Sequence, residues 1–184
     1  MLKCFYGSIA PRTPATGATG ATATISGFSG MIPTLSLGAG TTQLQNWSVA
    51  SPYYNNIAGF NPVTGNFTVP ATGTYSIKAT INYSNTAAFS AQVLGNVFPA
   101  FVVRRTSPGS TDLITGNLGV LNVNIALLLN LRVILGGGQV VLAGDVALTV
   151  GDVIGLFYLA NGLTITITGG NFNPPAAVWS IHSL

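Results

Sequence analysis

The fold of this chain is decided by residues 60–83, which read FNPVTGNFTVPATGTYSIKATINY. Phe67 and Val69 alternate with polar neighbours, which is the spacing of a half-buried strand, and the alternation resumes from Tyr75 to Ile81. Residues 70–73 (PATG) interrupt it, because proline cannot donate to a strand ladder and glycine permits positive φ. The stretch predicts two strands joined by a tight connection, in an antiparallel sheet with one face in water.

The chain downstream of Met31 continues in the same style. Short apolar or alternating segments are separated by Gly, Pro, Asn and Ser, and no segment favours a helix. Besides the two strands above, the pattern predicts strands at 32–37, 44–50, 88–94, 98–106, two within 114–135, 139–142, 146–150, 153–158, 163–168 and 177–184. About ten strands with regularly spaced turns predict an all-β sandwich.

Three segments resemble the C1q/tumour-necrosis-factor (TNF) jelly-roll superfamily. The order of Phe60, a Thr-Gly turn, Phe67, Pro70 and a Gly-Thr-Tyr strand start is similar to that family's signature. Residues 146–154 (VALTVGDVI) resemble its Gly-Asp strand pair, and residues 178–184 (VWSIHSL) its aromatic closing strand. The resemblance covers about residues 32–184. It implies a C1q/TNF-like jelly-roll β-sandwich that is homotrimeric, with an extended N-terminal segment.

Charge is scarce in this chain. Hydrophobic residues make up 48% and charged residues 5%, against about 25% charged in an ordinary domain. So few charges leave little repulsion between copies, which favours self-association. The net charge of +3 is small and scattered, and Arg104–Arg105 is its only basic cluster, so we expect no nucleic-acid partner.

The sequence predicts no membrane-spanning segment. The most apolar run, residues 125–135 (IALLLNLRVIL), has about half of the ~20 residues that a spanning helix needs, and it contains Asn130 and Arg132. Residues 1–6 lack the apolar core of a secretory signal. We therefore expect no membrane insertion, with synthesis in a cytosol and release by another route.

The first 30 residues differ from the rest and are interpreted as a docking peptide followed by a linker, before a domain at 31–184. Residues 12–24 are of low complexity, with two glycines at triplet spacing. They are either a remnant of a collagen-like stalk or a flexible linker, since two triplets cannot hold a triple helix. The residues before them are too apolar for a solvated tail. The predicted docking residues are Leu2, Cys4, Phe5, Tyr6 and Ile9.

Cys4 is the only cysteine, so it cannot form an intrachain disulfide. It is a free thiol, an interchain disulfide or anchor, or an inert residue. Lys3 beside it favours the thiolate.

Catalytic signals are missing from the sequence. With one histidine (His182), one cysteine and three acids, no nucleophile–base set or carboxylate pair stands out. A calcium site at Asp145 and Asp152 would need several more oxygen ligands, and the plainer interpretation is that Asp152 caps a turn. We expect no enzyme activity, cofactor or bound metal.

A narrower resemblance concerns function. A short Gly-Ala-Thr piece, a C1q-like domain without disulfides and very low charge are similar to the Bacillus collagen-like exosporium proteins. This implies a subunit of a spore- or cell-surface fibre, made in the mother-cell cytoplasm and fastened to a spore-coat or exosporium anchor protein. The near absence of a collagen region favours head-to-tail stacking of jelly-roll trimers through the N-terminal peptide. The alternative is a trimeric recognition head for a receptor or glycan.

Overall fold

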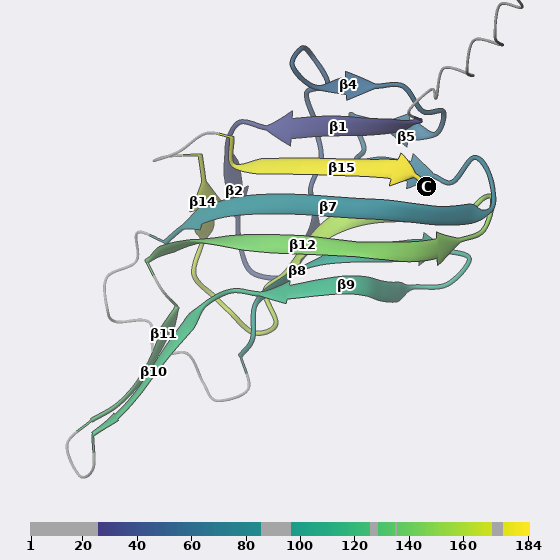
Figure 1. The fold of residues 1–184 in the computed structure, drawn as a ribbon. Helices are drawn as coiled ribbons and strands as arrows, with labels where there is room; N and C mark the ends of the chain where they lie inside the picture. Colours follow the sequence, from purple (N-terminus) through teal and green to yellow (C-terminus); the bar gives the residue numbers. More distant parts are fainter. Residues whose placement is uncertain (1–25, 86–96, 126–128, 135, 171–174) are drawn as a thin grey trace, which may run out of the picture.

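The computed structural model describes residues 26–85, 97–125, 129–134, 136–170 and 175–184. These residues form two antiparallel sheets packed face to face and a separate two-stranded hairpin (Figure 1). The predicted all-β sandwich is thereby confirmed. In the described part of the chain, no helix is long and apolar enough to cross a membrane.

The first sheet, here called the β7 sheet, is built around the longest strands. Its main path runs, in spatial order, through β12 (Gly137–Leu148), β7 (Gly73–Ser84), β15 (Ala177–Ser183), β1 (Gly27–Ile32) and β4 (Tyr54–Asn55). At the end of β7, the short strand β14 (Ile167–Gly169) pairs with β7 and with β2 (Leu35–Leu37). The first strand thus begins at Gly27, earlier than the predicted domain start at Met31.

The second sheet, the β13 sheet, covers the other side of the core. It runs through β5 (Phe60–Asn61), β6 (Asn66–Thr68), β13 (Val153–Leu159), β8 (Ala100–Ser107) and β9 (Thr111–Asn117). The short strand β3 (Thr41–Gln43) pairs with the C-terminal end of β13. Apart from the β8–β9 hairpin and the step from β14 to β15, the chain from β6 onward passes from one sheet to the other between successive strands of the sandwich, which is how a jelly roll is wound.

An aromatic cluster in the core joins the two sheets. The rings of Phe28 on β1 and Phe60 on β5 are stacked, with centroids 3.6 Å apart. Trp179 on β15 meets both rings edge-on, at 5.0 Å and 5.7 Å. Phe67 on β6 packs against Phe28 at 5.7 Å. Because these rings come from both sheets and are buried, the cluster fixes how the sheets sit on each other.

The opening stretch of the sequence contains the two predicted strands and the predicted break, but the prediction that they pair is wrong. Strand β6 pairs with β5 and β13, whereas β7 pairs with β12 and β15. The intervening turn carries the chain from one sheet to the other. Phe67 and Tyr75 meet across the core at 5.9 Å, edge to face. Alternation of apolar and polar residues shows only that one side of each strand is buried. Two strands in facing sheets have this pattern just as two paired strands of a hairpin do, so the pattern does not determine the partner.

Four other strand predictions are corrected. The strand expected at 32–37 is broken at Pro33 into the end of β1 and β2. Residues 44–50 form a loop with one bridge, Met31 to Ser48, although Leu44 and Trp47 are buried. Of the alternating run 163–168, only Ile167–Thr168 enter β14. Residues 139–142 and 146–150 belong mainly to one strand, β12, while the strand expected at 88–94 lies outside the described residues.

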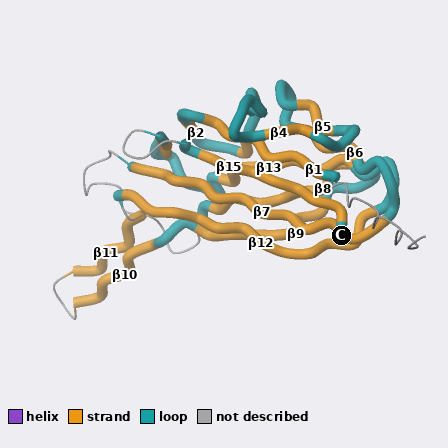
Figure 2. Tube along the Cα trace, turned by 45° about the horizontal axis from the view of Figure 1, so that its top comes forward, coloured by secondary structure: helices purple, strands orange, loops and turns teal. Residues whose placement is uncertain are grey.

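The two strands expected within 114–135 are confirmed, but they leave the sandwich. Strands β10 (Val120–Ile125) and β11 (Leu129–Ile134) pair with each other and project from one end of the body as an arm (Figures 1 and 2). The arm connects β9 to β12, which are edge strands of the two sheets. Packing of the core accounts for neither this arm nor the outward face of the β7 sheet.

Candidate assembly surface

The outward face of the β7 sheet is the largest regular surface of the domain. Strand pairing aligns Val141 of β12, Thr80 of β7, Val178 of β15 and Met31 of β1 in one row across four strands. Three of these four side chains are apolar, and Val141 is 59% exposed. The inward neighbours of these residues, such as Ile81, are fully buried in the core. A row of apolar side chains therefore crosses the middle of the outward face.

The next two rows mix short side chains with longer polar ones. Ala143, Lys78, Ser180 and Ser29 follow in register on the same four strands, and Asp145, Ser76 and His182 come next. Lys78 is exposed near the centre of this face and makes no ion pair with any described residue. The serine, threonine and alanine side chains of this face are short, so another surface can approach it closely at those positions.

One polar contact fixes the edge of this face. The hydroxyl of Tyr54 on β4 and Nε2 of His182 on β15 share a hydrogen bond of 2.5 Å, and both side chains are half-buried. Strand β4 has only two residues, paired to β1 at Ser29 and Phe28. The Tyr54–His182 contact reaches over β1 and so adds a side-chain link to a short backbone ladder.

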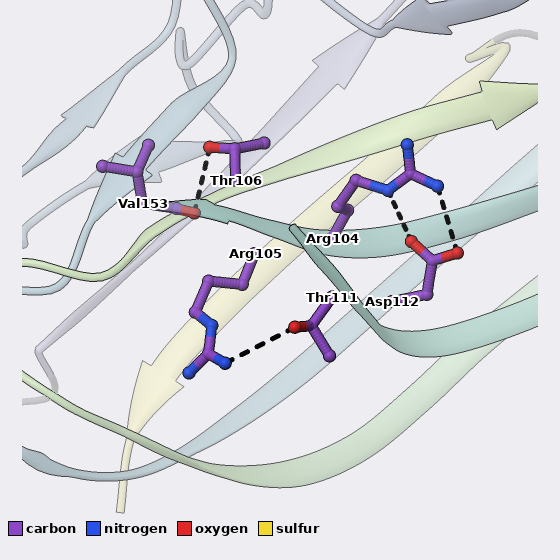
Figure 3. A network of polar contacts seen from close by, with 6 residues as sticks. All are labelled: Arg104, Arg105, Thr106, Thr111, Asp112 and Val153. Carbon is purple, nitrogen blue, oxygen red and sulfur yellow. Dashed lines mark hydrogen bonds and ion pairs between the residues drawn. The ribbon is translucent and has the colours of Figure 1, made fainter. Parts of the chain in front are cut away.

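The outward side of the β13 sheet differs in character, because its charges are paired. Arg104 on β8 donates from Nε to Oδ1 of Asp112 on β9 at 2.5 Å and from Nη2 to Oδ2 at 3.1 Å (Figure 3). This hydrogen-bonded carboxylate raises the pKa of the Arg104 guanidinium. The guanidinium also lies 5.5 Å from the ring centre of Phe157 on β13. The ion pair follows a bulge in the β8–β9 register, so it holds the strands together beyond the irregularity.

Arg105 and Asp152 form a second link nearby. Asp152 is nearly buried and accepts a hydrogen bond from the backbone N–H of Thr149 at 3.0 Å. Its Oδ2 lies 3.6 Å from Nη1 of Arg105. Nη2 of Arg105 is 3.5 Å from the hydroxyl of Thr111 (Figure 3). The interpretation of Asp152 as a turn cap is confirmed.

The other predicted site residues are not brought together. Asp145 is exposed on β12, in the other sheet from β13, and the described residues contain no cluster of three or more His, Cys, Asp or Glu side chains that could bind a metal. The docking residues Leu2, Cys4, Phe5, Tyr6 and Ile9 lie outside the described residues.

Sequence reasoning missed the apolar row of the β7 sheet. Each strand contributes one residue to the row, so no single segment contains a recognisable motif. The usable signal was the shortness of the outward side chains in 74–82, where the pattern predicted only a face in water.

The order of the strands defines the class of fold, a jelly-roll β-sandwich. Among solved structures, murine APRIL at pH 8.5 is similar over 88% of this chain and 100% of that chain, with 14% identity and a TM-score of 0.55. The globular domain of zebrafish complement 1qA is similar over 84% of this chain and 94% of that chain, with 17% identity and a TM-score of 0.48. Eiger TNF from S. frugiperda is similar over 87% of this chain and 92% of that chain, with 14% identity and a TM-score of 0.49. The APRIL likeness supports the jelly-roll fold of the TNF/C1q type that the sequence resemblance implied.

Sequence comparisons add nothing to this. No protein-family model matches the chain. No curated protein is similar to it in sequence.

Proposed function

We propose that this chain is a non-catalytic structural subunit that forms homotrimers through the outward face of the β7 sheet and stacks them into a surface fibre. The observation that carries the trimer is the apolar row of Val141, Thr80, Val178 and Met31. An apolar, nearly uncharged face of this kind gains free energy when it is buried. Three copies placed around a threefold axis bury one such face each, in a closed arrangement.

The TNF/C1q resemblance of the sequence implies the same oligomeric state. The charged residues are also distributed in a way that supports it. On the β13 sheet, Arg104 and Arg105 have carboxylate partners within the same chain. On the β7 sheet, Lys78 and Asp145 are the only charged side chains in the described strands, and they lie diagonally across the β7–β12 pair. That spacing allows them to neutralise each other when the face is covered.

The fibre is proposed from the N-terminal segment. Leu2, Phe5, Tyr6 and Ile9 make this segment apolar where a free tail would be polar. A trimer supplies three such segments to each junction, so weak single contacts add up through multivalency. Because the contact joins different surfaces, it repeats along an axis without closing. Cys4 would lock the junction by oxidation or fasten the fibre to a spore-coat or exosporium anchor.

The place of the fibre follows from the resemblance to exosporium proteins. We propose the spore surface, with synthesis in the mother-cell cytoplasm, or otherwise another extracellular surface. A receptor- or glycan-binding head is the second candidate. It is favoured by one observation, the guanidinium of Arg104 beside the half-exposed ring of Phe157 on a surface away from the β7 sheet.

Electron microscopy of the purified full chain tests the fibre. The expected result is a filament with a regular axial repeat. A variant with Leu2, Phe5, Tyr6 and Ile9 replaced by Ser, called the tail variant, should give discrete particles. The control Cys4→Ser should keep the filaments but lose part of their resistance to denaturant under oxidising conditions. Filaments of unchanged repeat from the tail variant would show that the contacts lie between the jelly rolls instead.

A further inference from the structure

The β10–β11 arm has two free edges. Its strands pair with each other over six residue pairs, from Val120–Ile134 to Ile125–Leu129, and no other described strand pairs with either. A two-stranded hairpin is marginally stable alone, and an open strand edge is a template for a further strand. The base of the arm is anchored by Ile134 in the core, and beyond it the arm pairs with no third strand among the described residues.

The arm is also two-sided. Residues that face each other across the ladder share a side, and sides alternate along each strand. By this register, one set of alternating positions, here called the aliphatic side, is occupied by Leu121, Val123, Ile125, Leu129, Leu131 and Val133. The central positions of the other set are occupied by Asn122, Asn124, Asn130 and Arg132. At the base of the arm, Leu121 is 40% exposed, whereas its cross-strand partner Val133 is buried. The pattern is that of a sheet with one face meant to be covered.

A lipid bilayer does not fit the dimensions of the arm. Its strands have six residues each, which is about 20 Å at ~3.3 Å per residue. A strand that crosses a bilayer needs about 9–11 residues. A protein strand of similar length fits better.

The first described strand, β1, begins at the end of the body opposite the arm. Gly27, where β1 begins, is in register with His182 and through it with Ser76, near the start of β7. The arm returns into β12 at Gly137, which pairs with Ser84 at the last residue of β7. Eight residues of strand separate the two places, roughly 26 Å at ~3.3 Å per residue. In a head-to-tail stack, the start of β1 in one copy would therefore lie toward the arm of the next.

We propose that residues 1–12 of one copy add as a third strand to a free edge of the β10–β11 arm of the next copy in the stack. The proposal rests on the proposed fibre and names the surface that receives the tail. In an extended strand, Leu2, Cys4 and Tyr6 share one side, which would extend the aliphatic side of the arm, while Lys3, Phe5 and Ile9 fall on the other side. Main-chain hydrogen bonds supply the affinity and the alternating side chains the specificity, as in other strand additions.

Two full-length variants that complement each other test this. The tail variant keeps its arm. The arm variant, Val123→Thr/Ile125→Thr/Leu131→Thr, keeps its tail and replaces the aliphatic side with residues of good strand propensity. Its matched control is Asn122→Thr/Asn124→Thr/Asn130→Thr, which places as many threonines on the other side. Light scattering reports mass and electron microscopy reports filaments.

The expected results differ for each sample. The control forms filaments as the wild type does. Each of the two test variants alone stays as single trimers, which also shows that its body has folded. Mixed in equal amounts they form pairs of trimers, twice the mass of either alone, without filaments, since one supplies only arms and the other only tails.

Other outcomes overturn the proposal in distinguishable ways. Filaments from the arm variant alone, with none from the tail variant, leave the fibre standing and exclude the arm as the receiving surface. Two inactive variants whose mixture gives no pairs also exclude it. A wild type that gives only single trimers overturns the fibre, and the arm proposal with it.

Discussion

Tyr54 and His182 lie 128 positions apart in the chain, and the Tyr54 hydroxyl and Nε2 of His182 are joined by a hydrogen bond of 2.5 Å. Tyr54→Phe keeps the ring beside the imidazole, whose centre is 6.2 Å away, but removes this bond. We expect a loss of about 1 kcal/mol in the free energy of unfolding. Tyr53→Phe is the control, because the Tyr53 hydroxyl has no hydrogen bond to the described residues. Equal denaturation midpoints for the two variants would contradict a role for the contact.

Gly65 is the position in the fold-deciding stretch that tolerates a side chain least. Its φ is +72°, and an added Cβ would lie 2.2 Å from the carbonyl oxygen of Leu44 and 3.0 Å from Nε1 of Trp47. That oxygen accepts the Trp47 indole hydrogen bond, so the clash would also displace a buried ring. Gly65→Ala should cost more than about 2 kcal/mol, combining strain with lost packing. Gly73→Ala, in the same stretch with open space around it, should change the denaturation midpoint little.

Because of Tyr158, the free energy of unfolding should fall at alkaline pH. Its side chain is fully buried, its hydroxyl has no hydrogen-bond partner among the described residues, and burial raises its pKa to about 12. The ordinary value, which applies to the unfolded chain, is about 10. A raised pKa favours the neutral phenol in the folded state. The stabilisation is therefore complete below pH ~10 and falls as pH rises from about 10 to 12, by about 2–3 kcal/mol in all.

Tyr158→Phe removes this part of the pH dependence. At neutral pH it should leave stability unchanged or raise it by up to about 1 kcal/mol, because it deletes a buried hydroxyl without a partner. Tyr83→Phe provides the contrast: the Tyr83 hydroxyl accepts the backbone N–H of Gly119, and its loss should destabilise. Urea titrations at pH 7 and pH 11 measure both. A Tyr158→Phe variant that loses as much stability between these pH values as the wild type would refute the assignment.

Thr80 lies in the centre of the apolar row, so a charge there should break the trimer. Thr80→Lys adds a cation two residues from Lys78 on the same face of β7. Burying an unpaired charge costs several kcal/mol. In the tail variant, we expect sedimentation velocity to show single chains with an unchanged sheet signature in circular dichroism. Thr68→Lys, exposed on the other sheet, should remain trimeric. Trimers from Thr80→Lys would place the interface elsewhere.

Local patterns in this sequence predict strands and breaks well but not their partners. Phe67 and Tyr75 were recognised as inward-facing, yet only the three-dimensional structure shows that their strands lie in different sheets. Trp47 and Leu44 are buried from a loop, because Gly65 on a positive-φ turn lets the chain approach them. Residues 114–135 did predict two strands, but no local pattern shows that these strands leave the sandwich between β9 and β12.

The candidate site was predictable to a smaller degree. The very low charge indicated self-association, but not which face would be used. The apolar row draws Val141 and Met31 from positions 110 residues apart, joined only through strand register. No spacing rule within one segment can find such a surface. The docking residues of the tail rest on composition alone and remain a prediction.

We propose above that three copies of this domain assemble through the outward face of the β7 sheet. Multi-angle light scattering of the full-length tail variant, which should not form filaments, measures this most directly. We expect a single species of three times the 18.8 kDa chain mass, unchanged over a hundredfold range of concentration. A species of one chain mass across that range would contradict it.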